Sequence, residues 1–84
     1  MVTSIRVTIE VLAGIRTPRR ERIVGLELPE DSTVRDALLT YGFKENEIEF
    51  LRVWRGGELA NLHTELKDAD KLSVAIPLSG GFLH

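Results

Sequence analysis

The sequence predicts an α+β domain in which a mixed sheet of four to five strands carries one main helix packed across it. Two observations predict this class. Apolar residues alternate with polar ones in four short stretches, and one stretch between the second and third repeats its apolar residues at helical spacing. The chain has 84 residues, enough for one domain. A hairpin and a single helix cannot bury both faces of a sheet, so we expect the helix to pack across one of them.

The first two strands are predicted at 4–13 and 21–30. In the first, the apolar residues that share one face are Ile5, Val7, Ile9 and Val11. In the second, they are Val24, Leu26 and Leu28. The stretch between them contains Gly14 and Pro18, and proline has no backbone N–H for a central ladder, so we expect a hairpin loop there. Gly25 indicates a bulge or a close backbone approach within the second strand.

The helix is predicted within 31–43. Thr33 is suited to the N-cap, and Asp36 stands three residues later, as in a capping box. Gly42 is suited to the C-cap, because glycine enters the left-handed conformation without a Cβ clash. The apolar face consists of Val34, Ala37, Leu38 and Tyr41. The acidic, polar stretch 44–49 is predicted to be a connecting loop.

The second half of the chain is predicted to form the remaining strands. Stretch 50–55 alternates, Gly56 and Gly57 indicate a tight hairpin turn, and 58–61 forms a short return strand. After a turn near Asp68 and Asp70, the last strand covers 71–78, with Leu72, Val74 and Ile76 on one face. The first and last strands are expected to pair in parallel at the centre of the sheet. This is the β-grasp arrangement, as in ubiquitin.

Composition excludes several classes of function. The net charge of −2 gives little attraction to nucleic acid or an anionic membrane, so neither is expected as a partner. There is no cysteine, which excludes disulfides, cysteine metal sites and a cysteine nucleophile. His63 and His84 are far apart in the sequence, so no metal site is expected. No long apolar run and no signal peptide are evident, and a cytoplasmic location is expected.

Three stretches together resemble the ubiquitin-like sulfur-carrier family. They are the opening strand, "DSTVRDALLTYGF", and "RVWRGGELANLHTELKDADKLSVAIPLSGG". The family includes the small subunit of molybdopterin synthase and the sulfur carrier of the thiamine pathway. The resemblance covers nearly the whole chain through Gly81 and is most specific from Leu66 to Gly81. One departure lies in the acidic turn, where the family usually has glycine and this chain has Ala69.

The resemblance implies a carrier rather than an enzyme. In the family, a separate ubiquitin-activating-like enzyme uses ATP to adenylate the terminal glycine, and a sulfur donor then leaves a thiocarboxylate for a sulfur-accepting synthase. Carried over to this chain, Gly81 is the reacting residue, and no bound cofactor is expected. Gly80 lets the backbone approach the nucleotide closely, because it has no Cβ. Ser79, Leu78 and Pro77 would contact the partner at the base of the tail, which Pro77 stiffens.

The segment Phe82-Leu83-His84 is the second departure, because the family usually ends at the second glycine. We therefore expect a β-grasp domain at 1–79 and a flexible tail at 80–84, from which a protease removes the last three residues. The receiving pathways that the resemblance implies are molybdopterin, thiamine and tRNA thiolation, which all use such carriers.

Three alternatives stay open. The processed tail could serve a protein modifier joined through Gly81 to lysines. The glycines could be an unprocessed terminus on a β-grasp interaction module, because fold alone does not determine function. The chain could also be a small or regulatory subunit of a larger enzyme.

A patch of arginines at 16, 19, 20 and 22 is interpreted as a solvated hairpin tip rather than a nucleic-acid site.

Trp54 is the remaining candidate contact residue. Strand alternation places Val53 inward and Trp54 on the opposite face. An exposed tryptophan can anchor a partner protein. The competing interpretation is that Trp54 packs against a neighbouring strand or an arginine stem. Phe43 and Phe50 are expected to pack in the core or against loops.

Overall fold

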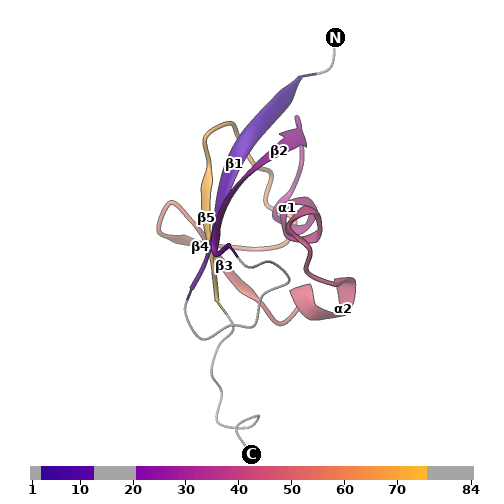
Figure 1. The fold of residues 1–84 in the computed structure, drawn as a ribbon, viewed down its shortest axis with the longest axis vertical. Helices are drawn as coiled ribbons and strands as arrows, with labels where there is room; N and C mark the ends of the chain where they lie inside the picture. The colour runs from indigo at the N-terminus through magenta and orange to yellow at the C-terminus, as the bar shows by residue number, and fades with distance from the viewer. Residues whose placement is uncertain (1–2, 13–20, 76–84) are drawn as a thin grey trace, which may run out of the picture.

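The computed structural model describes residues 3–12 and 21–75, which form one sheet and two helices (Figure 1). The elements, in chain order, are β1 (Ser4–Val11), β2 (Ile23–Pro29), α1 (Val34–Tyr41), α2 (Glu45–Ile48), β3 (Arg52–Arg55), β4 (Glu58–Ala60) and β5 (Lys71–Ala75). The mixed sheet and the helix across it confirm the predicted fold class. Residues 76–84, which include Ile76 of the predicted last strand, lie outside the described part of the chain.

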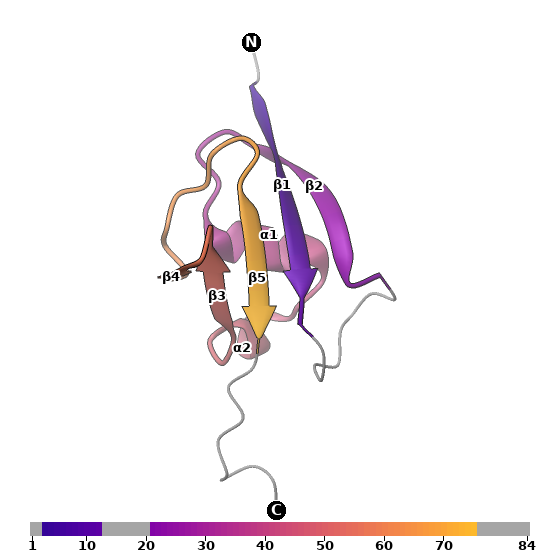
Figure 2. The same cartoon turned by 90° about the vertical axis from the view of Figure 1, so that its left-hand side faces the viewer.

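The sheet has five strands in the order β2-β1-β5-β3-β4. β1 and β5 pair in parallel, and the other three pairings are antiparallel. β5 is therefore the middle strand, as the sequence predicts. Figure 2 shows the strands in front and α1 behind them, so the helix covers one face of the sheet and leaves the other open.

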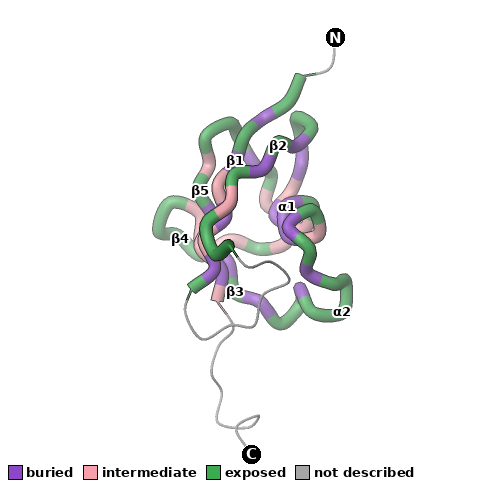
Figure 3. The backbone as a smooth tube through the Cα atoms, viewed as in Figure 1, coloured by how far each residue is buried: buried purple, intermediate pink, exposed green. Residues whose placement is uncertain are grey.

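The core lies between the sheet and α1 (Figure 3). Each strand of the sheet centre contributes alternate residues to it, and α1 contributes the four residues of its predicted apolar face. Its largest fully buried side chains are Tyr41, Ile9, Leu38, Leu72, Val7, Val34 and Val74. Burial on this scale, at about 25 cal/mol per Å² of apolar surface, is the main stabilising term of the domain.

The start of α1 is satisfied by its own cap and by a distant loop. Thr33 Oγ1 accepts the N–H of Asp36 at 3.4 Å, and the Asp36 carboxylate accepts the N–H of Thr33 at 2.9 Å, which confirms the capping box. The N–H groups of Val34 and Arg35, which have no partner within the helix, donate to the carbonyls of Thr64 and Leu62. The loop between β4 and β5 is thereby attached to the helix that covers the sheet.

The prediction of a loop over 44–49 is wrong, because Glu45–Ile48 forms a short helix. Ile48 is 2% exposed and anchors it to the core, while the Glu47 carboxylate accepts the N–H of Lys44. The guanidinium of Arg35 also forms an ion pair with Glu45. The prediction overlooked Ile48, a single buried apolar residue within an acidic stretch.

The two phenylalanines differ. Phe43 is buried and stacks on Tyr41, with ring centroids 5.2 Å apart, as expected of a core residue. Phe50 follows α2 and is 63% exposed, so of the two expected placements, core or loop, the core is excluded.

Gly25 causes no bulge, which corrects the sequence prediction. β1 and β2 pair in continuous register, with Thr8 opposite Gly25. A Cβ at Gly25 would meet no other heavy atom within 4 Å. The glycine therefore serves neither a bulge nor a close approach to described residues.

The acidic turn before β5 has a left-handed residue at its centre. Ala69 has a φ of 72°, and the N–H of Asp70 donates to the carbonyl of Lys67 across the turn. The turn also binds β1: Asp68 Oδ1 accepts the N–H of Arg6 at 2.9 Å, and the N–H of Ala69 donates to the carbonyl of Arg6 at 2.8 Å. A positive φ favours glycine, which explains why alanine is a departure here.

No helix within residues 3–12 and 21–75 has the length and apolar character needed to cross a membrane.

Candidate partner-binding face

The predicted tail residues Pro77, Leu78, Ser79, Gly80 and Gly81 lie outside the described residues. What the structure does place is the strand that leads to them. β5 is the middle strand of the sheet and ends at Ala75, and the tail residues follow directly in sequence. The candidate site is therefore built from the sheet face around β5, where Trp54 lies.

Trp54 projects from β3 on the open face, opposite the helix. Val53 before it is 2% exposed and belongs to the core, whereas Trp54 is half-buried. Its cross-strand neighbours are Ser73 on β5 and Leu59 on β4. Packing against neighbouring strands thus accounts for part of its surface, and the rest faces outward. Both interpretations of Trp54 made from the sequence have a basis in this geometry.

Leu59 is a member of this face that the sequence analysis did not single out. It is 63% exposed and lies directly across from Trp54. The signal was present in the sequence: Gly56 and Gly57 have φ values of 59° and 90°, which makes a two-residue turn between Arg55 and Glu58. A two-residue turn determines the register, and the register places Leu59 beside Trp54.

One row of side chains crosses the entire open face at the level of Trp54. Cross-strand pairs connect, from edge to edge, Ile23, Glu10, Ser73, Trp54 and Leu59. The two ends and Trp54 are apolar, with Ile23 also 63% exposed. Next to the row, Lys71 Nζ lies 3.6 Å from Glu10 Oε1. This row and Lys71 form the part of the open face that is available for partner contact.

Arg55, at the end of β3, belongs to the scaffold rather than to the open face. Its Nη1 donates to the carbonyl of Glu65 at 2.8 Å and lies 3.9 Å from Asp70 Oδ2. It connects β3 to the loop that precedes β5. Arg22 also has a structural contact, because its Nη1 donates to the carbonyl of Leu12 at 3.0 Å. The other arginines of the predicted hairpin tip, at 16, 19 and 20, lie outside the described residues.

The described residues offer no metal centre. Within residues 3–12 and 21–75, no group of three or more histidine, cysteine, aspartate or glutamate side chains could hold a metal ion. His63 is exposed, and its N–H donates to the side chain of Asn61. The arrangement of the open face is suited to protein contact, with exposed apolar side chains beside a few charges.

The similarity of this chain to known proteins lies in its structure. No protein-family model and no curated protein sequence matches the chain. Solved structures do match. SAMP1 from Haloferax volcanii superposes with a TM-score of 0.70 at 25% identity, over 90% of this chain and 99% of SAMP1. A molybdopterin converting factor, subunit 1, from Pyrococcus furiosus gives a TM-score of 0.71 at 21% identity, over 88% of this chain and 99% of the other.

The chain has a ubiquitin-like β-grasp fold. A further match, the HVO 2177 protein of Haloferax volcanii, has a TM-score of 0.72 at 22% identity, over 93% of this chain and 88% of that protein. A second structure of the first match carries the description small archaeal modifier protein 1. The predicted β-grasp fold is thereby confirmed, and the proteins that share it include both a modifier protein and a molybdopterin converting factor subunit.

Proposed function

We propose that this β-grasp protein is a sulfur carrier, and that it becomes active when the chain ends at Gly81. The observation that supports the proposal is the position of the glycines: β5, the middle strand of the β-grasp sheet, ends at Ala75, and Gly80 and Gly81 follow five and six residues later in the sequence. The fold is shared with a molybdopterin converting factor subunit. The carrier acts with partner enzymes and needs no catalytic residue of its own.

The chemistry takes place at the Gly81 carboxylate. A partner adenylating enzyme binds ATP, and a carboxylate oxygen of Gly81 attacks its α-phosphorus. Pyrophosphate leaves, and an acyl-adenylate remains. A sulfur donor then attacks the acyl carbon and AMP leaves, which forms the thiocarboxylate that a synthase accepts. While Phe82 is joined to Gly81, this carbonyl belongs to an amide and cannot be adenylated, so a protease must first remove residues 82–84.

The open face serves as the docking surface for the adenylating enzyme. Trp54 and Leu59 lie on the same sheet face, Trp54 on β3 next to β5 and Leu59 one strand further away on β4, and the end of β5 leads into the reacting tail. Exposed aromatic side chains are frequent anchors of protein interfaces. An interface here positions the partner next to the strand from which the tail begins.

The test is reconstitution with a ubiquitin-activating-like enzyme, ATP and a sulfide source. A chain ending at Gly81 should support ATP–pyrophosphate exchange and gain the mass expected when one oxygen is replaced by sulfur. The matched control retains Phe82-Leu83-His84 and should do neither. Failure of the chain that ends at Gly81, under conditions where an established carrier reacts, would contradict the proposal.

A second candidate is a protein modifier conjugated through Gly81, because one matched structure is described as a modifier protein. The same reconstitution separates the two. Thiocarboxylate supports sulfur transfer, whereas adducts to lysine side chains of other proteins support modification. Both require the free Gly81 carboxylate. If deletion of residues 80–84 leaves partner binding and phenotype unchanged, the chain is instead an interaction module.

A further inference from the structure

The second surface of interest is the outer edge of β2, at the opposite edge of the sheet from Leu59. β2 is the first strand of the sheet order, so it pairs only with β1 among the described strands. It is seven residues long, whereas β4 at the other edge has three. Long unpaired edges are templates for pairing with another chain, and natural proteins usually block them.

The hydrogen-bond pattern identifies which groups of β2 point outward. The N–H of Val11 donates to the carbonyl of Arg22, and the N–H of Glu30 donates to the carbonyl of Thr3. In an antiparallel pair, every second residue bonds to the partner strand. The even-numbered residues of β2 therefore bond to β1, and Ile23, Gly25 and Glu27 direct their N–H and C=O groups away from the sheet.

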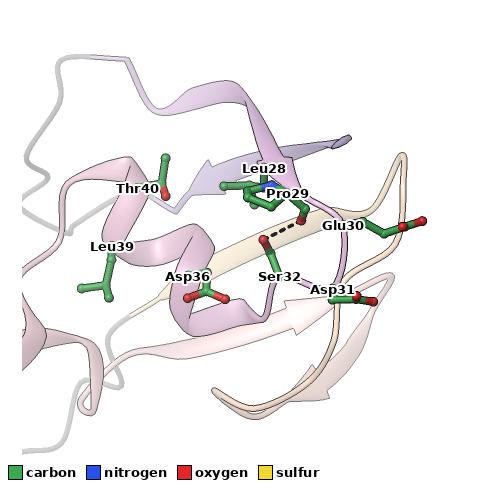
Figure 4. Close-up of a pocket in the computed structure, with 8 residues that line it drawn as sticks. All are labelled: Leu28, Pro29, Glu30, Asp31, Ser32, Asp36, Leu39 and Thr40. Atoms are coloured by element: carbon green, nitrogen blue, oxygen red, sulfur yellow. Dashed lines mark hydrogen bonds between the residues drawn. The ribbon is translucent and has the colours of Figure 1, made fainter. Parts of the chain in front are cut away.

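A shallow hollow of about 440 Å³ lies beside the end of this edge, between β2 and α1 (Figure 4). α1 contributes Asp36, Leu39 and Thr40, which share one side of the helix because they are three and four positions apart. Pro29, which is exposed, contributes apolar surface from the strand, whereas Leu28 is 2% exposed and belongs to the core. The full set of lining residues is Leu28, Pro29, Glu30, Asp31, Ser32, Asp36, Leu39 and Thr40.

The charge of the hollow has one sign. Glu30, Asp31 and Asp36 are all exposed, and neither lysine nor arginine is among the lining residues. These carboxylates, near the exposed Pro29 and the partly buried Leu39, suit a lysine or arginine, whose aliphatic stem packs on apolar surface while its cation remains near acceptors. Of the basic residues near β2, Arg22 donates to the carbonyl of Leu12, and Arg6 lies on β1 opposite Glu27.

We propose that the β2 edge and the hollow together bind an extended basic segment of another protein. Its backbone pairs with the outward groups of Ile23, Gly25 and Glu27, as a sixth strand of the sheet. A lysine or arginine side chain at one end of the segment enters the hollow beside Asp36. This mode of binding uses backbone hydrogen bonds for affinity and the side-chain site for specificity.

This inference goes beyond the carrier function. The edge lies two strands away from β5, at the opposite edge of the sheet from β4 and Leu59. Its test needs neither Gly81 nor an activating enzyme.

The experiment titrates the full chain, labelled with ¹⁵N, with a synthetic peptide that alternates valine and threonine and carries two arginines at one end. Saturable shifts of the Ile23, Gly25 and Glu27 amide signals are expected below about 1 mM peptide. The control peptide, with two glutamates in place of the arginines, should bind about tenfold more weakly, an effect of the size of one or two exposed ion pairs.

Two matched variants test the two halves of the site. Gly25→Pro removes the central outward N–H and should abolish binding, whereas Gly25→Ala keeps the N–H and should bind normally, since its Cβ has room. A thermal melt checks that both fold. If Gly25→Pro does not fold, the double variant Glu30→Gln/Asp31→Asn replaces it and should weaken binding of the arginine peptide about threefold to tenfold, while the glutamate peptide, no longer repelled by the two carboxylates, should bind no more weakly than before.

Three results would overturn the proposal. One is the absence of saturable shifts on β2. Another is equal affinity for the arginine and glutamate peptides. The third is a change of the β2 amide signals on simple dilution of the protein, which would assign the edge to a second copy of this chain.

Discussion

The two faces of the sheet are built from the same strands but have different tasks. On the covered face, Leu72 and Val74 are fully buried against α1. On the open face, Ser73 between them lies in a row with the half-buried Trp54 and the exposed Leu59. The difference shows how a small domain separates stability from recognition: one set of alternate residues holds the fold, and the other is available for partners.

The largest effect is expected on the covered face. Leu72→Ala should lower the free energy of unfolding by about 2–5 kcal/mol, because the side chain is fully buried on the middle strand and its loss leaves a cavity. Urea unfolding followed by circular dichroism measures this. A loss below about 1 kcal/mol would show that the core is not centred on β5.

An intermediate effect is expected at the start of the helix that makes the two faces unequal. Thr33→Ala should cost about 1 kcal/mol, because it removes the hydroxyl that accepts the N–H of Asp36. Thr33→Ser retains the hydroxyl and is the matched control. Equal unfolding midpoints for the two variants in urea would mean that the loop contacts from Thr64 and Leu62 suffice to start the helix.

A smaller gain is expected at the turn into β5. Ala69→Gly should raise the free energy of unfolding by about 0.5–1 kcal/mol, because glycine adopts the positive φ without a Cβ clash. Asp31 also has a positive φ, of 75°, but aspartate tolerates this conformation better. Asp31→Gly should therefore gain less, and a thermal melt that ranks the two in the opposite order would contradict this account of the turn.

The smallest effect on stability is expected on the open face. Leu59→Ala should change the free energy of unfolding by less than about 0.5 kcal/mol, because the side chain is 63% exposed.

The effect of substitutions on the open face on partner binding should be large. Trp54→Ala and Leu59→Ala should each weaken binding to the adenylating enzyme by about tenfold or more, as measured by calorimetry. Normal binding by both folded variants would remove the open face from the proposed interface.

Most of the fold could be predicted because local signals agree with tertiary packing. Alternation placed Ile9 and Leu72 inward, and the capping residues Thr33 and Asp36 marked the helix start. The errors have local causes. Ile48 is one apolar residue in an acidic stretch and gives no periodicity, yet its burial stabilises a short helix. Gly25 indicated a bulge, but on an edge strand nothing nearby requires the missing Cβ.

The candidate site was less accessible from the sequence. Trp54 could be placed on the open face by alternation, but its neighbour Leu59 depends on the register that the Gly56-Gly57 turn imposes. The hollow between β2 and α1 combines residues up to twelve positions apart along the chain, from Leu28 to Thr40, and only the crossing of helix and strand brings them together. For the tail glycines, sequence remains the source of the prediction.

The most direct test of the carrier proposal is the intact mass of the protein purified from its native host. The account predicts a form that ends at Gly81 and, after incubation with the adenylating enzyme, ATP and sulfide, a mass increase that corresponds to replacement of one oxygen by sulfur. A protein that retains Phe82-Leu83-His84 under every growth condition, with no form ending at Gly81, would contradict it.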